Sequence, residues 1–397
     1  MKRALVILVL GMLAWIPSGA QAIWDIGHLT EVKESLDEPF YSAALEALEG
    51  RADAALEAEP LSVMMKKKIP ASGDRHDYMS LARYFWPDPS KPDGLPYISR
   101  DGHSNPELND LDRNKLGETS ERVTVLSLTY FFTGDEKYAQ KAAELLRVWF
   151  LNEDTRMNPN LEYAQMVPGH NGGKGRCYGI LDTYSFVQML DAVALLEDSE
   201  AFTDEDAAAL KKWFGELLDW ILASPQGRQE SSSANNHGTA YDAQVIAFAL
   251  YSGKEDIARK ILDEFPEKRI FAQIAPDGSQ PHELTRTRSY HYSHYNLGFF
   301  IDVFLMAKNL GVDMDESVSE DGRSFYKAVD FLVPYIGEGG EERWPYEQIN
   351  GFDEVSRKLC MDLLRIARYL APERTDYIRL CETYADVPLA DPFNLLY

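Results

Sequence analysis

The sequence has few cysteines, few positive charges and only one long apolar run. Its three cysteines, Cys177, Cys360 and Cys381, are an odd number without metal-ligand spacing, so no disulfide framework carries the fold. At most one pair, Cys360 with Cys381, could form a bridge. The formal charge of −24 disfavours nucleic acid and anionic membranes as partners. After the N-terminal run, no segment approaches the ~20 apolar residues that a membrane-spanning helix needs.

The first residues are typical of an export signal. A Lys-Arg pair precedes the apolar run at 4–15, and Ala20-Gln21-Ala22 offers small residues for a cleavage site. We therefore predict a signal peptide over 1–22 and a mature chain over 23–397 that forms a single domain. Such a chain would be periplasmic or secreted.

Strand-like alternation is scarce, whereas apolar residues recur at three- and four-residue intervals along most of the chain. Gly134 and Gly253 each separate two such segments, which is typical of paired helices joined by short turns. The pattern predicts an all-α fold, an (α/α) toroid of helical hairpins with long active-site loops, although an open solenoid fits equally well. The predicted helices cover about 40–57, 119–132, the segment after Asp135, 181–197, 203–224, 239–251, 254–265, 295–310, 324–336 and 354–371.

Two long loops, 69–118 and 155–180, interrupt the helical pattern, and loops of this length usually serve function. The first contains aromatic residues, among them Tyr78 and Trp86, beside arginine and aspartate. Aromatic faces stack on sugar rings, so Tyr78 and Trp86 are candidates for glycan contacts. Composition leaves open the alternative that these aromatics only pack the loop onto the helices.

Asn235-Asn236-His237-Gly238 directly precedes a predicted helix. Helix N-termini expose backbone N–H groups and favour anions, so two amides and an imidazole at this position indicate an anion site. Asn235 alone suits an ordinary capping role. His237 alone could equally be a core histidine.

A second polar cluster at 280–296 contains three tyrosines, three histidines and two arginines. A zinc site is not favoured, because His282-Glu283 lacks the second histidine of a His-Glu-x-x-His helix. His291 and His294 supply only two ligands. We predict no metal and no cofactor.

A third cluster, Pro168 to Arg176, is rich in glycine, which lets backbone approach a ligand closely. It lacks the Lys-Ser/Thr ending of a phosphate loop. A flexible turn is the alternative.

These residue types suit the β-elimination of a 4-linked uronan. The enzyme must neutralise the carboxylate next to C5, remove the C5 proton and protonate the leaving O4 oxygen. Asn236, His237 and Arg286 can neutralise the carboxylate. Tyr292 can serve as acid and base if a nearby arginine lowers the phenol pKa from its usual value of about 10.

The same motifs resemble the alginate-lyase-domain family of polysaccharide lyases over roughly 75–310. The resemblance implies an (α/α) toroid that acts on alginate or glucuronan without a required metal or organic cofactor. The motifs that carry it are Asn235 to Gly238, Gln273 to Ser289, Tyr292-Ser293, Asn296-Leu297, Asp77 to Ser80, Trp86 to Pro89 and Asn158 to Gln165.

The resemblance also assigns roles to residues. It implies that Asn236, His237 and Arg286 surround the uronate carboxylate, and that Tyr292 donates the proton to O4. Tyr292 or His237 then acts as base, depending on the face that C5 presents. Further expected substrate contacts are Asn171, which matches a carboxylate-neutralising asparagine, and His170, Arg176, Tyr178, Asn235, Arg288 and His294.

The chain departs from the better-known alginate lyases in two ways. It has Tyr-Ser-His-Tyr at 292–295 where they have Tyr-His-Asn-Tyr, and its Arg-to-Tyr spacing is one residue shorter. This indicates the branch with broad alginate lyases and glucuronan lyases. An acidic polysaccharide also requires a locally basic cleft, with candidates at Lys66 to Arg75, Lys174 to Arg176 and Arg286 to Arg288.

Two other functions remain open on the sequence. A toroidal glycoside hydrolase would need two carboxylic acids about 6.5–9.5 Å apart if inverting, and Asp242, Asp277 and Glu283 are candidates. A non-catalytic glycan-binding protein would need only the aromatic loops, and it leaves the Asn-His-Arg-Tyr set without a role.

Overall fold

The computed structural model describes residues 22–384 and 390–397. The predicted signal peptide lies outside the described residues except for Ala22. Within the described part, no helix is both long and apolar enough to cross a membrane.

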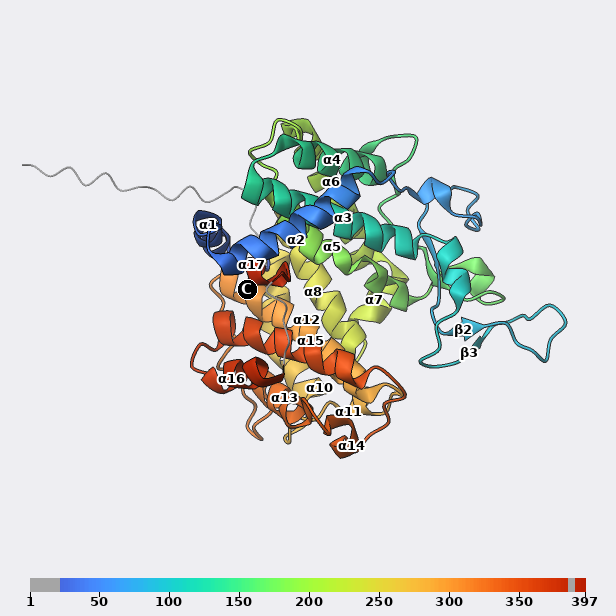
Figure 1. Cartoon of the computed structure of the whole chain (residues 1–397). Helices are drawn as coiled ribbons and strands as arrows, with labels where there is room; N and C mark the ends of the chain where they lie inside the picture. The colour runs from blue at the N-terminus through green and yellow to red at the C-terminus, as the bar shows by residue number, and fades with distance from the viewer. Residues whose placement is uncertain (1–21, 385–389) are drawn as a thin grey trace, which may run out of the picture.

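Helices dominate the structure, as the apolar periodicity predicts (Figure 1). Local signals fix several of their ends: Gly134 ends one helix in the left-handed conformation at φ 70°, and Thr203 and Asp206 form a capping box. The longer helices are α1 (Ile26–Glu34), α2 (Pro39–Leu56), α3 (Arg113–Thr133), α4 (Glu136–Leu146), α5 (Ser185–Ala194), α6 (Asp204–Ala223), α8 (Asn236–Tyr251), α9 (Glu255–Phe265), α12 (Ser289–Asn309), α13 (Phe325–Leu332), α15 (Phe352–Arg365) and α16 (Thr375–Tyr384). The shorter ones are α7 (Pro225–Ser231), α10 (Phe271–Gln273), α11 (Pro281–Leu284), α14 (Gly340–Arg343) and α17 (Phe393–Leu396).

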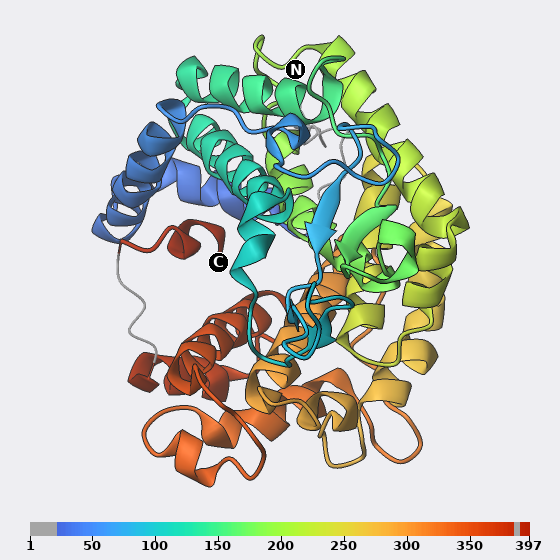
Figure 2. The same ribbon diagram turned by 90° about the vertical axis from the view of Figure 1, so that its right-hand side faces the viewer.

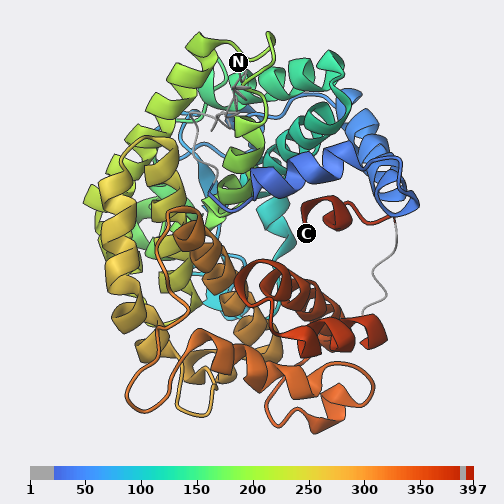
Figure 3. The ribbon, with the colours of Figure 1, turned by 90° about the vertical axis from the view of Figure 1, so that its left-hand side faces the viewer.

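These helices form an (α/α) toroid, which Figures 2 and 3 show from two sides. The helices α3, α5, α8, α12 and α15 contact one another in that order, and each of α3, α8, α12 and α15 packs against the helix that follows it in the chain. The C-terminal α17 contacts α1 and α2, so the end of the chain fills the space beside the first helices. The predicted toroid is confirmed, and the open solenoid does not describe the fold.

Two helices that carry predicted site residues begin earlier than the sequence predicts. The helix expected from 239 begins at Asn236, and the helix expected from 295 begins at Ser289. Apolar periodicity misses these first turns because their side chains are polar or aromatic. His237 and Tyr292 therefore lie on helices rather than on the preceding loops.

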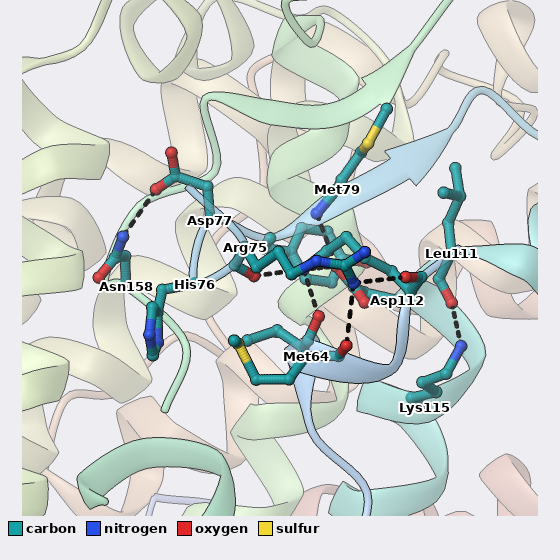
Figure 4. Close-up of polar contacts among 12 residues, drawn as sticks. Met64, Arg75, His76, Asp77, Met79, Leu111, Asp112, Lys115 and Asn158 are labelled. Atoms are coloured by element: carbon teal, nitrogen blue, oxygen red, sulfur yellow. Dashed lines mark hydrogen bonds and ion pairs between the residues drawn. The ribbon is translucent and has the colours of Figure 1, made fainter. Parts of the chain in front are cut away.

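The two long loops meet through short strands. β1 (Met79–Leu81) pairs in parallel with β4 (Tyr163–Met166), and β2 (Phe85–Trp86) pairs with β3 (Ile98–Ser99) in an antiparallel hairpin. Asn158 also donates to the Asp77 carboxylate at 2.9 Å, as Figure 4 shows. Segments about 80 residues apart in the sequence thus form one wall over the toroid.

A buried ion pair holds the base of the first loop. Lys66 Nζ lies 3.1 Å from Asp112 Oδ2, with both side chains fully buried, and Asp112 also accepts the backbone N–H of Met79 (Figure 4). Breaking a buried pair leaves an unpaired charge, so this contact fixes the loop where it leaves the toroid. Lys66 therefore anchors the loop, which corrects its prediction as part of a basic cleft.

The three cysteines are buried free thiols. Cys381 Sγ donates to the carbonyl of Cys360 at 3.2 Å, so the two residues are close but not bridged in this structure.

Candidate active site

A cavity of about 460 Å³ lies where α8 and α12 face the two loops. It brings together residues that the sequence separates by more than 200 positions. Those predicted from sequence that line it are Arg176, Tyr178, Asn235, Asn236, His237, Arg286 and Tyr292.

The cavity is basic although the chain is strongly acidic. Four arginines line it, Arg83, Arg113, Arg176 and Arg286, and Asp101 is the one carboxylate among its lining residues. A basic cleft in an acidic surface attracts anions locally even though the net charge of −24 repels them at long range. The cleft that an acidic glycan requires is therefore present.

The N-terminus of α8 is held by Glu283. This buried carboxylate accepts the backbone N–H of Asn236 at 2.7 Å and its side-chain amide at 2.8 Å. Asn235 occupies the N-cap position, but its side chain makes no capping hydrogen bond, which corrects that expectation. Burial raises the pKa of Glu283, and the hydrogen bonds from Asn236 oppose this rise. Asn236 keeps a second amide N–H and an unpartnered Oδ1 for a ligand.

His237 is oriented by a second buried carboxylate. Its Nδ1 lies 2.5 Å from Glu230 Oε1, and the Glu230 side chain is 1% exposed. Because this contact places a proton on Nδ1, Nε2 is the nitrogen available to a ligand. The imidazole also packs against the ring of Tyr178, with centroids 4.6 Å apart.

Arg286 joins the helices to the first loop. Its Nη2 lies 2.6 Å from Asp101 Oδ1, and its guanidinium lies 3.8 Å from the ring centroid of Tyr292. Burial acts to raise the pKa of Asp101, but the hydrogen bond and charge of Arg286 outweigh it and lower that pKa overall. A cation over an aromatic face is attracted by the ring quadrupole.

Tyr292 is a neutral phenol in this site. Burial and the neighbouring Tyr84 raise its pKa above the usual value, and Arg286 offsets this only in part. Its hydroxyl lies 2.9 Å from the Tyr84 hydroxyl, which comes from the first loop. Arg286 lowers this pKa, as the sequence analysis expected, but the loss of water around the buried ring outweighs it and the net pKa is raised.

Arg176 is placed by a strained backbone position. Gln165 is buried with φ 49°, a left-handed conformation that costs energy outside glycine. Its backbone carbonyl and side-chain oxygen both accept from Arg176, at 3.2 Å each. The guanidinium lies over the rings of Phe85 and Tyr178. The strained turn therefore holds a cation at the cavity wall.

Three predicted contacts lie away from the cavity, which corrects their assignment. Tyr78 is fully buried and donates to Asp182 at 3.1 Å. His294 is buried with Nε2 2.9 Å from Asp362. Arg288 is paired by its backbone with Gln348 and does not line the cavity. Composition favours aromatic, histidine and arginine side chains in a glycan site, but Tyr78 and His294 are buried in the fold and Arg288 is half-buried outside the cavity lining.

The remaining predicted contacts lie at the rim. Asn171 lines a neighbouring hollow with Lys174, Arg176 and Tyr178, and its φ of 48° shows the tight turn that the glycines suggest. His170 is exposed beside it. Trp86 lies on β2, where its indole N–H donates to the His103 carbonyl and Arg100 lies over its ring.

Sequence reasoning missed Tyr84, Glu230 and Arg83. Tyr84 and Arg83 belong to the aromatic first loop, whose position over α12 depends on the pairing of β1 with β4. Glu230 lies on α7, seven residues before His237, a spacing that matches no motif.

The carboxylates that a hydrolase would need are already engaged. Asp242 is fully buried against Arg269, Asp277 bonds the backbone N–H of Ser279 in its turn, and Glu283 holds Asn236. None of the three lines the cavity. In the described part of the chain, no group of three or more His, Cys, Asp or Glu is placed to hold a metal.

Comparisons with known proteins identify the family of this chain. The alginate lyase family model matches residues 62–344. The crystal structure of an alginate lyase from Bacteroides ovatus is 47% identical, covers 96% of this chain and 99% of that chain, and superposes with a TM-score of 0.93. Alginate lyase A1-III from Sphingomonas species A1 is 17% identical, with a TM-score of 0.43 over 75% of this chain and 78% of that one. A search of curated proteins finds no match. The chain belongs to the alginate lyase family.

Proposed function

We propose that this protein is a polysaccharide lyase that cleaves alginate or a related 4-linked uronan by β-elimination. The observation that carries the proposal is the neutral Tyr292 hydroxyl beside Arg286 and His237 in a basic cavity. The Bacteroides ovatus relative is described as an alginate lyase, which supports alginate as the substrate.

The substrate carboxylate would bind where the basic groups converge. The free amide N–H of Asn236, the imidazole of His237 and the guanidinium of Arg286 line one cavity. Fixed donors aimed at the charge that develops on the carboxylate stabilise the transition state in which the C5 proton leaves. Glu283 and Asp101 keep two of these donors in place.

Tyr292 would donate its proton to O4, because a phenol with a raised pKa holds that proton until the C4–O4 bond breaks. Mannuronate and glucuronate present the C5 proton and O4 on the same face, so Tyr292 can take up the C5 proton as its own proton passes to O4. Guluronate presents the C5 proton on the opposite face. His237 Nε2 then takes it, with Glu230 stabilising the imidazolium.

The cavity adjoins two further hollows, which favours cleavage within a polymer. It shares Arg176 and Tyr178 with the hollow around Lys174, and it shares Arg83 and Tyr295 with a second hollow. A chain bound across all three would present an internal bond to Tyr292. We therefore propose endo-acting cleavage.

A substrate panel tests the proposal. Polymannuronate, polyguluronate and glucuronan are incubated with the enzyme, and ultraviolet absorbance from unsaturated uronate ends is followed together with product size. We expect absorbance with at least one uronan and a rapid fall in polymer length. Reducing sugar without absorbance would show hydrolysis, and binding without turnover would show a glycan-binding protein.

A further inference from the structure

Asp191 lies on α5, far along the chain from the residues that its carboxylate binds. The side chain is buried, and it accepts three consecutive backbone N–H groups, from Ala22 at 2.6 Å, Ile23 at 2.6 Å and Trp24 at 2.7 Å. These are the first residues that the structure describes. A single carboxylate therefore binds three consecutive residues at the start of the described chain.

This carboxylate has no cationic partner in the described part of the chain. Burial and, to a smaller extent, the neighbouring acid Asp302 raise the pKa of Asp191 to about 7 against the three hydrogen bonds. A buried carboxylate normally pairs with a cation, because an unpaired charge is costly in a low-dielectric interior. A positive group close to Ile23 would compensate the buried negative charge of Asp191.

The predicted cleavage site supplies such a group. Ala20 and Ala22 are the small residues that favour hydrolysis between Ala22 and Ile23. We propose that this bond is cut during export and that the new Ile23 α-ammonium forms a buried ion pair with Asp191. Water is the co-reactant: its oxygen remains on the Ala22 carboxylate, which leaves with the signal peptide, and the Ile23 nitrogen becomes an amine that takes up a proton.

The hydrogen bonds around Asp191 can accommodate the new N-terminus at Ile23. An ammonium has three N–H donors, so Ile23 can replace the hydrogen bonds of both the Ala22 and Ile23 amides, while the Trp24 amide remains. Cleavage also removes the hydrogen bond from Asn309 to the Ala22 carbonyl. Ile23 lines a second cavity of about 460 Å³, which gives the new terminus room and access to water.

The side chains around the cut end keep it in position. Ile23 is 5% exposed and Trp24 is 3% exposed, so both are part of the core. Ala22 is equally buried at 3%, so a protease reaches the bond only before this part folds. The ion pair would then form as the exported chain folds, and it would join the N-terminus to α5 at the cavity that Tyr397 also lines.

The first test is the mature N-terminus. The full chain is expressed with its own leader in a Gram-negative host, and the exported protein is analysed by N-terminal sequencing and intact mass. We expect a chain that starts at Ile23. Any other first residue overturns the proposal.

The second test separates the ion pair from an ordinary hydrogen bond. Asp191→Asn is introduced into the chain that starts at Ile23 and into a chain that retains Met-Ala before Ile23, and thermal unfolding is measured for all four proteins. We expect Asp191→Asn to lower the Tm by about 5 °C more in the Ile23 chain, because only there does it break a buried charge pair. Asp242→Asn, which breaks the buried pair with Arg269, is the matched control. It should lower the Tm by the same amount in both backgrounds.

A third measurement remains available if Asp191→Asn fails to fold. The α-amino group of the native Ile23 chain is acylated at neutral pH and compared with that of the Met-Ala extended chain. We expect labelling at least about tenfold slower in the Ile23 chain, since a buried, paired amine reacts slowly. Equal labelling rates, or equal costs of Asp191→Asn in both backgrounds, would overturn the ion pair.

Discussion

The two walls of the cleft are built differently. The helical wall presents Asn236, His237 and Tyr292 from the first turns of α8 and α12, where the buried Glu283 and Glu230 hold the first two in place. The loop wall presents its groups from segments that depend on β1 pairing with β4. Asn236, His237 and Tyr292 therefore lie on helices, and the loop wall faces them across the cavity.

Two of the contacts between the walls concern the groups with assigned roles. Tyr84 and Tyr292 share a hydrogen bond of 2.9 Å, and Asp101 pairs with Arg286 at 2.6 Å. Both contacts lie beside the group that we assign as proton donor. Substitutions on the helical wall should therefore remove turnover, while those on the loop wall should weaken positioning or binding.

The largest effect is expected from Tyr292→Phe. Removing the proton donor should lower kcat about a thousandfold, because loss of a general acid or base typically lowers the rate by about this factor. KM should stay within about threefold of the wild-type value. Steady-state kinetics on the best uronan checks this. Tyr290→Phe is the matched control, because Tyr290 is buried outside the cavity, where its ring stacks on Phe352. Loss of turnover in Tyr290→Phe or Tyr295→Phe instead would contradict the assignment.

The next effect is expected from Glu230→Gln. An amide cannot stabilise the His237 imidazolium, so kcat should fall about tenfold to a hundredfold on guluronate and less on mannuronate. The ratio of kcat values on the two block types measures this. An equal loss on both substrates would show that His237 serves only the carboxylate, and no loss would show that Glu230 does not act through His237.

A smaller effect is expected from Asp101→Asn on the loop wall. The pKa of Asp101 is lower in the folded protein than the value of about 4 expected in the unfolded chain. Its ion pair with Arg286 therefore stabilises the folded protein fully above a pH of about 4, and this stabilisation is lost as the pH falls through the folded-state pKa. The variant should lose several-fold in kcat/KM at neutral pH and differ less from the wild type under strongly acidic conditions. A constant ratio across the pH profile would contradict this role.

The smallest effect is expected from Arg83→Ala. Arg83 is exposed in the cleft, and its guanidinium makes no hydrogen bond or ion pair with the described residues, so it is free for a second substrate carboxylate. KM for polymer should rise about threefold, and the rise should shrink at high salt. Arg51→Ala is the control, since Arg51 pairs with Glu121 and lies outside the catalytic cavity. An unchanged KM, or an equal rise in Arg51→Ala, would remove Arg83 from the binding site.

The helical wall was predictable from sequence, and the loop wall only in part, through Arg176 and Tyr178. His237 and Tyr292 stand in short motifs beside helix starts, where local spacing determines position. Tyr84 and Glu230 act through partners that only the folded chain brings near, across more than 200 residues for Tyr84. Tyr78 and His294 were misassigned because composition cannot distinguish a buried bond to Asp182 or Asp362 from a ligand contact.

The most direct test of β-elimination is the origin of the product oxygen. Uronan is cleaved in water enriched in oxygen-18, and the products are analysed by mass spectrometry for the first turnovers. Elimination breaks the C4–O4 bond without adding water, so we predict unsaturated products that carry no label from the cleavage step. Products with one labelled oxygen per broken bond, and no unsaturated ends, would show hydrolysis and contradict the roles given to Tyr292 and His237.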